Sequence, residues 1–149
     1  MFKPDREQLR SVFLNAWRKA KSGEVLEPLE QQIVEVAKRH PEYQATLEAG
    51  DEMLDHDWLP EDGATNPFLH LGLHLSVLDQ IATDRPTGIR KLYQQMIRTC
   101  LGDVHQAEHR IMDCVAEAVW KKQRAGGDLD QKAMLKCIKK RGGGTRERG

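Results

Sequence analysis

Apolar residues recur along most of the chain at steps of three and four positions, which is the spacing of one face of an α-helix. The segments with this pattern are 5–21, 27–39, 42–49, 66–82, 87–101, 104–123 and 129–138. The alternation of apolar and polar residues that is typical of a half-exposed strand does not occur. The sequence therefore predicts an all-α fold, a compact bundle of about five to seven helices with short connections.

Capping residues agree with these boundaries. Asp5 precedes the first helix and Asn66 the fourth, both as N-caps, and Pro67 stands at the first helical position of the fourth. His40 is followed by Pro41, which disfavours helical dihedrals at His40 and ends the second helix. The first helix is expected to bury Leu9, Val12, Phe13, Ala16, Trp17 and Ala20, and the second Leu29, Ile33, Val34 and Ala37.

The segment 66–82 is the most apolar long stretch, and it carries two histidines, His70 and His74, four residues apart. Side chains at this spacing lie on the same face of a helix. A second pair with the same spacing, His105 and His109, lies in the helix predicted for 104–123. Both pairs are expected to face the interior, because apolar residues continue their rows: Val77, Leu78 and Ile81 after the first pair, and Met112, Ala116 and Val119 after the second.

Buried neutral imidazoles need partners for their ring nitrogens, and each unpaired nitrogen costs about 1–3 kcal/mol. A divalent transition metal satisfies several of these nitrogens at once, and H-x-x-x-H pairs on helices have the geometry to hold an ion. Imidazole sites of this kind suit zinc, iron or nickel, and also copper. The alternative is that all four histidines are hydrogen-bonded core residues without a metal.

Acidic residues near the pairs are further candidates. Glu108 follows His105 by three positions and is either a fifth ligand, a hydrogen-bond acceptor for a ligand's far ring nitrogen, or a surface carboxylate beside Arg110. Asp113 continues the second row and either orients His109 or faces water. A long loop predicted for 50–66 either covers the site or is simply solvated, and it holds Asp55, His56, Asp57 and Glu61.

The cysteines, Cys100, Cys114 and Cys137, are three in number and form no C-x-x-C unit. We therefore expect free thiols, with neither a disulfide framework nor a zinc ribbon, and free thiols are typical of a reducing cytoplasm. No segment is long and apolar enough for a membrane span, and no signal peptide follows Met1. These features predict a soluble, cytoplasmic protein.

Acidic and basic residues balance at 23 each, so the whole chain has no net charge that would attract nucleic acid. The length predicts one helical domain over 1–140, followed by a flexible tail over 141–149 that is rich in glycine and arginine. The segment 136–148 is strongly basic but lacks interleaved aromatic residues, so at most a weak contact with nucleic acid is expected. A homo-oligomer formed through an exposed helix face is compatible with the sequence.

No G-x-S-x-G, G-x-G-x-x-G or G-x-x-x-x-G-K-[ST] motif occurs, so neither a serine hydrolase nor a nucleotide-binding loop is indicated. Two functions remain. The first is binding of a divalent metal through the two histidine pairs on facing helices, and an enzyme built on it would use the metal to activate water or polarise a substrate. The second is a metal-free structural or interaction protein, an accessory factor that contacts a protein or RNA partner through its basic C-terminus.

Several segments resemble a bacterial family of small proteins, the domain of unknown function DUF1841. They are 66–74, 84–89, 105–109 and 116–120, together with Met1-Phe2 and 40–43. The resemblance covers about residues 1–140 and leaves the basic tail outside. It implies a bacterial cytoplasmic protein whose most recognisable motifs coincide with the two histidine pairs, and it implies no particular activity.

Overall fold

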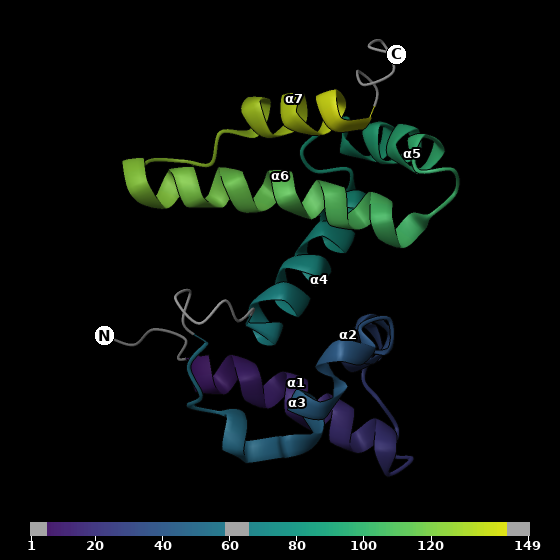
Figure 1. Cartoon of the computed structure of the whole chain (residues 1–149), viewed down its shortest axis with the longest axis vertical. Helices are drawn as coiled ribbons and strands as arrows, with labels where there is room; N and C mark the ends of the chain where they lie inside the picture. The colour runs from purple at the N-terminus through teal and green to yellow at the C-terminus, as the bar shows by residue number, and fades with distance from the viewer. Residues whose placement is uncertain (1–5, 59–65, 143–149) are drawn as a thin grey trace. The chain divides into compact units, whose positions relative to one another are not determined.

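The structure is a computed structural model, and it describes residues 6–58 and 66–142 (Figure 1). Every regular element within these ranges is helical, so the all-α prediction is confirmed. The predicted N-cap Asp5 lies outside the described residues. The elements are α1 (Arg6–Lys21), α2 (Pro28–Lys38), η1 (Pro41–Tyr43), α3 (Gln44–Ala49), η2 (Gly50–Met53), α4 (Pro67–Thr83), α5 (Ile89–Thr99), α6 (Val104–Ala125) and α7 (Gln131–Gly142), where η marks a short 3-10 helix.

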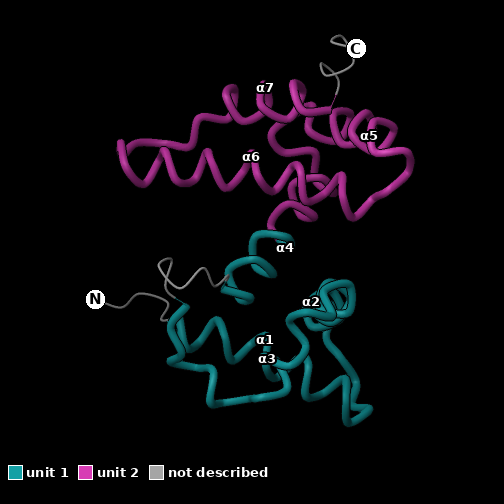
Figure 2. The backbone as a smooth tube through the Cα atoms, in the orientation of Figure 1, with its two compact units in different colours: residues 1–75 teal, residues 76–149 magenta. Residues whose placement is uncertain are grey.

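The chain divides into two compact units, residues 1–75 and 76–149, which Figure 2 draws in teal and magenta. Unit 1 contains α1 to α3, unit 2 contains α5 to α7, and the boundary falls inside α4. The first half of α4 therefore contributes Phe68, Leu71 and His74 to unit 1, and the second half contributes Val77 and Ile81 to unit 2. A single domain over 1–140 stays a prediction.

In unit 1, α1 packs against α2 and α3. Helix α2 begins with a capping box: the Glu27 side chain accepts a hydrogen bond from the Glu30 backbone N–H, and the Glu30 side chain accepts one from the Glu27 backbone N–H. Pro28 takes the first helical position. The apolar residues buried in this unit are Leu14, Ala16, Trp17, Ile33, Val34, Val36, Ala37, Leu47, Phe68 and Leu71.

The buried faces of α1 and α2 agree with the predicted ones only in part, since Ala16, Trp17, Ile33, Val34 and Ala37 are buried as predicted. Leu9 and Val12 on α1 and Leu29 on α2 are exposed, whereas Arg10 and Val36 are buried. Both helices carry apolar residues on adjacent rows, and spacing alone does not choose between such rows. The choice is made by the elements that pack against each helix, and for α1 these include the segment that follows α3.

Arg10 on α1 binds the segment that follows α3. Its side chain is 4% exposed, and its guanidinium lies over two aromatic rings, 5.0 Å from the centroid of Trp58 and 5.2 Å from that of Phe68. Burial lowers the pKa of the guanidinium below its ordinary value. Its Nη1 donates hydrogen bonds to three backbone carbonyls, those of Met53 at 2.9 Å, Leu54 at 3.1 Å and His56 at 2.8 Å.

The predicted loop at 50–66 is therefore anchored in the part that the structure describes. It opens with η2, and Arg6 adds a 2.6 Å hydrogen bond from Nη1 to Asp57 Oδ1 and a 3.1 Å bond from Nη2 to the carbonyl of Asp55. The bond from Arg6 holds the pKa of the Asp57 carboxyl below its usual range. Glu61 lies outside the described residues.

Glu30 makes the stability of unit 1 sensitive to acid. Its Oε1 accepts hydrogen bonds from Lys19 Nζ at 2.7 Å and from the Glu27 backbone N–H at 2.8 Å, and these bonds, Lys19 first, lower its pKa below 4.5. Because the folded pKa lies below the unfolded one, this stabilisation is present above the ordinary glutamate pKa and is lost as pH falls through the lowered value.

Glu30→Gln is therefore expected to lower the urea midpoint of unfolding at neutral pH and to have less effect in acid. The measurement is a pair of urea titrations, one at neutral pH and one below the ordinary glutamate pKa, for wild type and variant. Glu35→Gln, on the same helix, is the matched control, and an equal loss at both pH values would contradict the assignment.

In unit 2, α7 packs against both α5 and α6. Helix α6 begins as the sequence predicts, because Asp103 Oδ1 accepts the Gln106 backbone N–H at 3.0 Å. It ends at Gly126, which adopts a left-handed φ of 80°. No helix among the described residues combines the length and the apolar character that crossing a membrane requires.

The buried face of α6 also differs in part from the predicted row. Met112 is buried, but Ala116 is exposed and Val119 is only half-buried. A neighbouring row is buried in their place, on a helix that packs against α5 and α7. This row consists of Ala107, Ile111, Cys114, Val115 and Ala118.

The cysteines give a second correction. Cys114 and Cys137 form a disulfide that joins α6 to α7, so the predicted free thiols are wrong for this pair. Cys100 is a free, buried cysteine, as predicted. The two bonded residues are 23 positions apart and share no motif. Only the packing of the two helices reveals that they are partners.

Helix α7 extends beyond the predicted end at residue 138, so that Arg141 and Gly142 are helical. The Thr99 hydroxyl donates a hydrogen bond to the Gly142 carbonyl, and a Cβ at Gly142 would lie 3.0 Å from Met96 Sδ. This contact is tight, so a side chain at position 142 would have to displace the Met96 side chain. The rest of the predicted tail, 143–149, lies outside the described residues.

Candidate metal site in unit 1

Three histidines of unit 1 lie close together, and of these the sequence predicted only His70 and His74 as site residues. One ring nitrogen from each of His40, His70 and His74 lies within 4.8 Å of the others. His40 and His74 are fully buried, and His70 is half-buried. We call these residues the three-histidine cluster, and its geometry is compatible with binding a metal ion.

His40 is held in place by its own backbone. Helix α2 ends at Lys38, and the His40 N–H donates to the Ala37 carbonyl at 3.0 Å before Pro41 starts η1. The ring then folds back so that Nδ1 lies 2.8 Å from the Val36 carbonyl. A carbonyl only accepts hydrogen bonds, so Nδ1 carries the proton. In the neutral ring, Nε2 is therefore the nitrogen with a lone pair.

That nitrogen faces His70, and the two Nε2 atoms are 3.1 Å apart. Two nitrogens bound to one ion at about 2.0–2.1 Å lie about 2.9 Å apart at a right angle and about 3.4 Å apart at the tetrahedral angle. The observed separation falls between these values. It also permits an N–H···N hydrogen bond when no ion is bound, in which His70 donates to His40.

The rings are packed against one another and against Tyr43. The His40 ring is nearly parallel to Tyr43, with 5.4 Å between centroids, and it meets His70 and His74 edge-on at 4.8 and 5.2 Å. Burial raises the pKa of the Tyr43 phenol above its ordinary value, and Glu42 adds to this shift. The phenol therefore stays neutral beside the cluster.

His70 and His74 are placed by α4. Asn66 caps this helix as the sequence predicts, because its Oδ1 accepts the backbone N–H groups of Phe68 at 3.0 Å and Leu69 at 3.2 Å. The four-residue spacing then brings the two rings to one side, with 6.4 Å between centroids. This half of the site follows from the sequence directly.

The second pair lies on α6 in unit 2. His105 and His109 are both half-buried, and their ring centroids are 4.0 Å apart. The shared face predicted for this pair is therefore present. Its membership in a metal site stays a prediction.

The acidic candidates have different environments. Glu108 is 3% exposed, and its Oε2 accepts a 2.8 Å hydrogen bond from the Tyr93 hydroxyl, so it is not a surface carboxylate beside Arg110. Asp113 is exposed and forms an ion pair with Arg141 at 3.2 Å. Of its two predicted roles, orienting His109 or facing water, the second is therefore the observed one.

His40 is the residue that sequence reasoning missed. It belongs to no H-x-x-x-H pair, and its place before Pro41 indicates only the end of a helix. The last carbonyls of a helix lack a partner within the helix, so the ring of a histidine just after the helix end can donate a hydrogen bond to the carbonyl four positions earlier. This is the one local feature that indicates a fixed ring orientation. Its approach to His70, 30 residues away, is a tertiary contact.

Comparison with known proteins adds a family but no activity. No curated protein and no solved structure matches the chain. A family model described as a domain of unknown function, DUF1841, matches residues 5–140. This range includes all of the three-histidine cluster and both predicted pairs. The chain therefore belongs to the DUF1841 family.

Proposed function

We propose that this protein binds a divalent transition-metal ion through His40, His70 and His74. The observation that carries the proposal is the hydrogen bond from His40 Nδ1 to the Val36 carbonyl, which directs the Nε2 lone pair toward His70. Histidines that bind metals typically donate their other ring N–H to a carbonyl or carboxylate in this way. The bond fixes both the tautomer and the ring orientation before any ion arrives.

Burial supports the same proposal. His40 and His74 are removed from water, so an ion held by their rings would be shielded from solvent on that side. One ion accepts a nitrogen from each of the three rings. Binding requires the rings in their neutral form.

The donor set suits zinc, iron(II) or nickel. Three imidazoles leave at least one coordination position for water, a substrate or another side chain. An ion with a bound water would be a Lewis acid able to activate that water. The further ligands predicted from sequence, His105, His109 and Glu108, remain part of the proposal as candidates for those positions.

The test is elemental analysis of the tag-free protein, purified without a chelating resin, compared with the double variant His70→Ala/His74→Ala. We expect about one equivalent of a transition metal in the wild type and almost none in the variant. His56→Ala is the matched control, because His56 belongs to the same unit but not to the cluster. Wild-type protein that stays metal-free after incubation with zinc, iron(II) and nickel would contradict the proposal.

Single variants test the second pair. His109→Ala and His105→Ala are titrated with the metal found in the wild type, in competition with a chromophoric chelator. A loss of affinity for either variant would assign that residue to the site. Affinities equal to the wild type would restrict the site to unit 1 and remove the pair from the proposal.

A further inference from the structure

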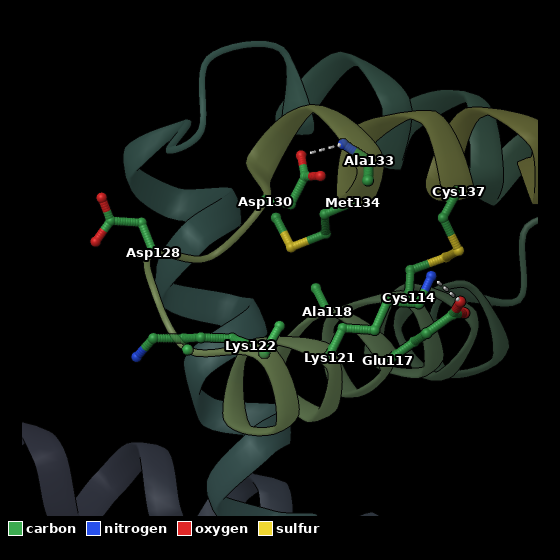
Figure 3. Close-up of a pocket in the computed structure, with 12 residues that line it drawn as sticks. Cys114, Glu117, Ala118, Lys121, Lys122, Asp128, Asp130, Ala133, Met134 and Cys137 are labelled. Atoms are coloured by element: carbon green, nitrogen blue, oxygen red, sulfur yellow. Dashed lines mark hydrogen bonds and ion pairs between the residues drawn. A yellow bond between two sulfur atoms is a disulfide. The ribbon is translucent and has the colours of Figure 1, made fainter.

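A pocket of about 230 Å³ lies between α6 and α7 in unit 2. Figure 3 shows the Cys114–Cys137 disulfide on its wall, with Ala118 and Met134 lining the interior and Lys122 and Asp128 pointing away from it. Glu117 and Lys121 form an ion pair at 3.1 Å beside the disulfide. The disulfide therefore borders an open, mostly apolar space.

The two sulfurs are not equivalent. Cys114 is 1% exposed and lies in the buried row of α6, whereas Cys137 on α7 is half-buried. Thiol–disulfide exchange requires a thiolate to approach one sulfur along the axis of the bond. Both cysteines line the pocket, and Cys137 is the more exposed of the two, so attack is expected at Cys137 with the buried Cys114 as the leaving group.

We propose that Cys114–Cys137 is an exchangeable redox couple, reduced through the pocket by a dithiol. A thiolate of the dithiol attacks Cys137 Sγ, the Cys114–Cys137 bond breaks, and Cys114 leaves as a thiolate that takes up a proton. The second thiol of the reductant then attacks the reductant sulfur that is bonded to Cys137, which forms the reductant's disulfide and releases Cys137 as a thiol. The protein disulfide is reduced by two electrons, and the dithiol is oxidised to a disulfide.

Reduction removes the covalent link between α6 and α7 but leaves their apolar contacts, which include Met134 and Ile138. The couple thus controls how firmly α7 is attached within unit 2. Cys100 takes no part, because it is buried on α5's C-terminal end and lines no part of this pocket. The proposal is independent of the metal site, whose residues are not in the pocket.

The first test is reduction of the air-oxidised, full-length protein by dithiothreitol under native conditions, with free thiols trapped by a maleimide and counted by mass spectrometry. We expect two thiols to appear without denaturant, at a rate within about tenfold of that for urea-unfolded protein. Cys100 should stay unmodified until the protein is unfolded. Three thiols in the air-oxidised protein, or a disulfide that resists reduction until urea is added, would overturn the proposal.

Two single variants test the asymmetry of the sulfurs. In Cys114→Ser, the thiol of Cys137 is left beside the pocket and should form a mixed disulfide with oxidised glutathione. In Cys137→Ser, the thiol of Cys114 is left in the buried row and should react much more slowly. Equal rates, or faster reaction of Cys114, would contradict attack at Cys137.

A substitution in the pocket distinguishes reduction through the pocket from reduction that follows unfolding. Ala133 lines the pocket one helical turn before Cys137, so Ala133→Phe should cover this sulfur and slow reduction several-fold. Lys132→Phe is the matched control, because Lys132 is exposed on the same helix and does not line the pocket. If both variants are reduced at the wild-type rate, the reductant does not enter through this pocket and the proposed route is wrong.

Discussion

Replacing His40 by alanine is expected to weaken metal binding by more than about 100-fold, because loss even of a residue that only supports a ligand costs 10–100-fold. The variant removes a ligand nitrogen and also the hydrogen bond to the Val36 carbonyl that orients it. The affinity is measured by competition with a chromophoric chelator. The same change should abolish the rise in melting temperature on adding metal, which in wild type corresponds to about 2.7 kcal/mol at 100 times the dissociation constant.

His40→Gln gives a second variant of similar size in case the alanine variant folds poorly. His56→Ala again serves as the control, and its affinity should equal that of the wild type. If His40→Ala and His40→Gln both fold and retain wild-type affinity, His40 is a hydrogen-bonded core residue and the metal, if bound, is held elsewhere.

Replacing Arg10 by methionine is expected to lower the free energy of unfolding of unit 1 by about 3 kcal/mol, since hydrogen bonds from a charged group contribute about 1.5–3 kcal/mol each and are not additive. Methionine fills much of the same volume but leaves the carbonyls of Met53, Leu54 and His56 without their donor. The stacking over Trp58 and Phe68 loses its cationic partner at the same time. Urea unfolding followed by tryptophan fluorescence measures the loss.

Arg10→Lys retains the charge but not the planar fork, so an intermediate loss is expected. Arg18→Met is the control on the same helix, because Arg18 is exposed and should tolerate the change. A loss for Arg10→Met no larger than that for Arg18→Met would show that the three bonds to the segment after α3 contribute little.

Local features of the sequence account for much of the helical framework. Asn66 caps the helix that it was expected to cap, Asp103 caps α6 directly before its predicted start, and Gly126 ends α6 where a left-handed residue is needed. The neighbouring positions of His70 and His74 follow from the same rule, since four residues make about one helical turn. Each of these features depends only on residues within about one turn.

The buried rows were predicted less well, for a different reason. Leu9 on α1 and Ala116 on α6 satisfy the helical period, yet both are exposed, whereas Arg10 is buried. Periodicity identifies the rows that are apolar, and the packing of other elements selects the row that is buried. A charged residue enters the interior only where distant carbonyls are available to it, and those of Met53 to His56 lie more than forty positions away.

The sequence alone therefore determined the all-helical class, most helix ends and the shared face of each histidine pair, because these depend on interactions within one or two helical turns. Tertiary structure decided that His40 joins His70 and His74, that Arg10 is buried, and that Cys114 is bonded to Cys137. Each of these contacts joins residues more than twenty positions apart. Such contacts form only when several helices pack together, and no local pattern encodes them.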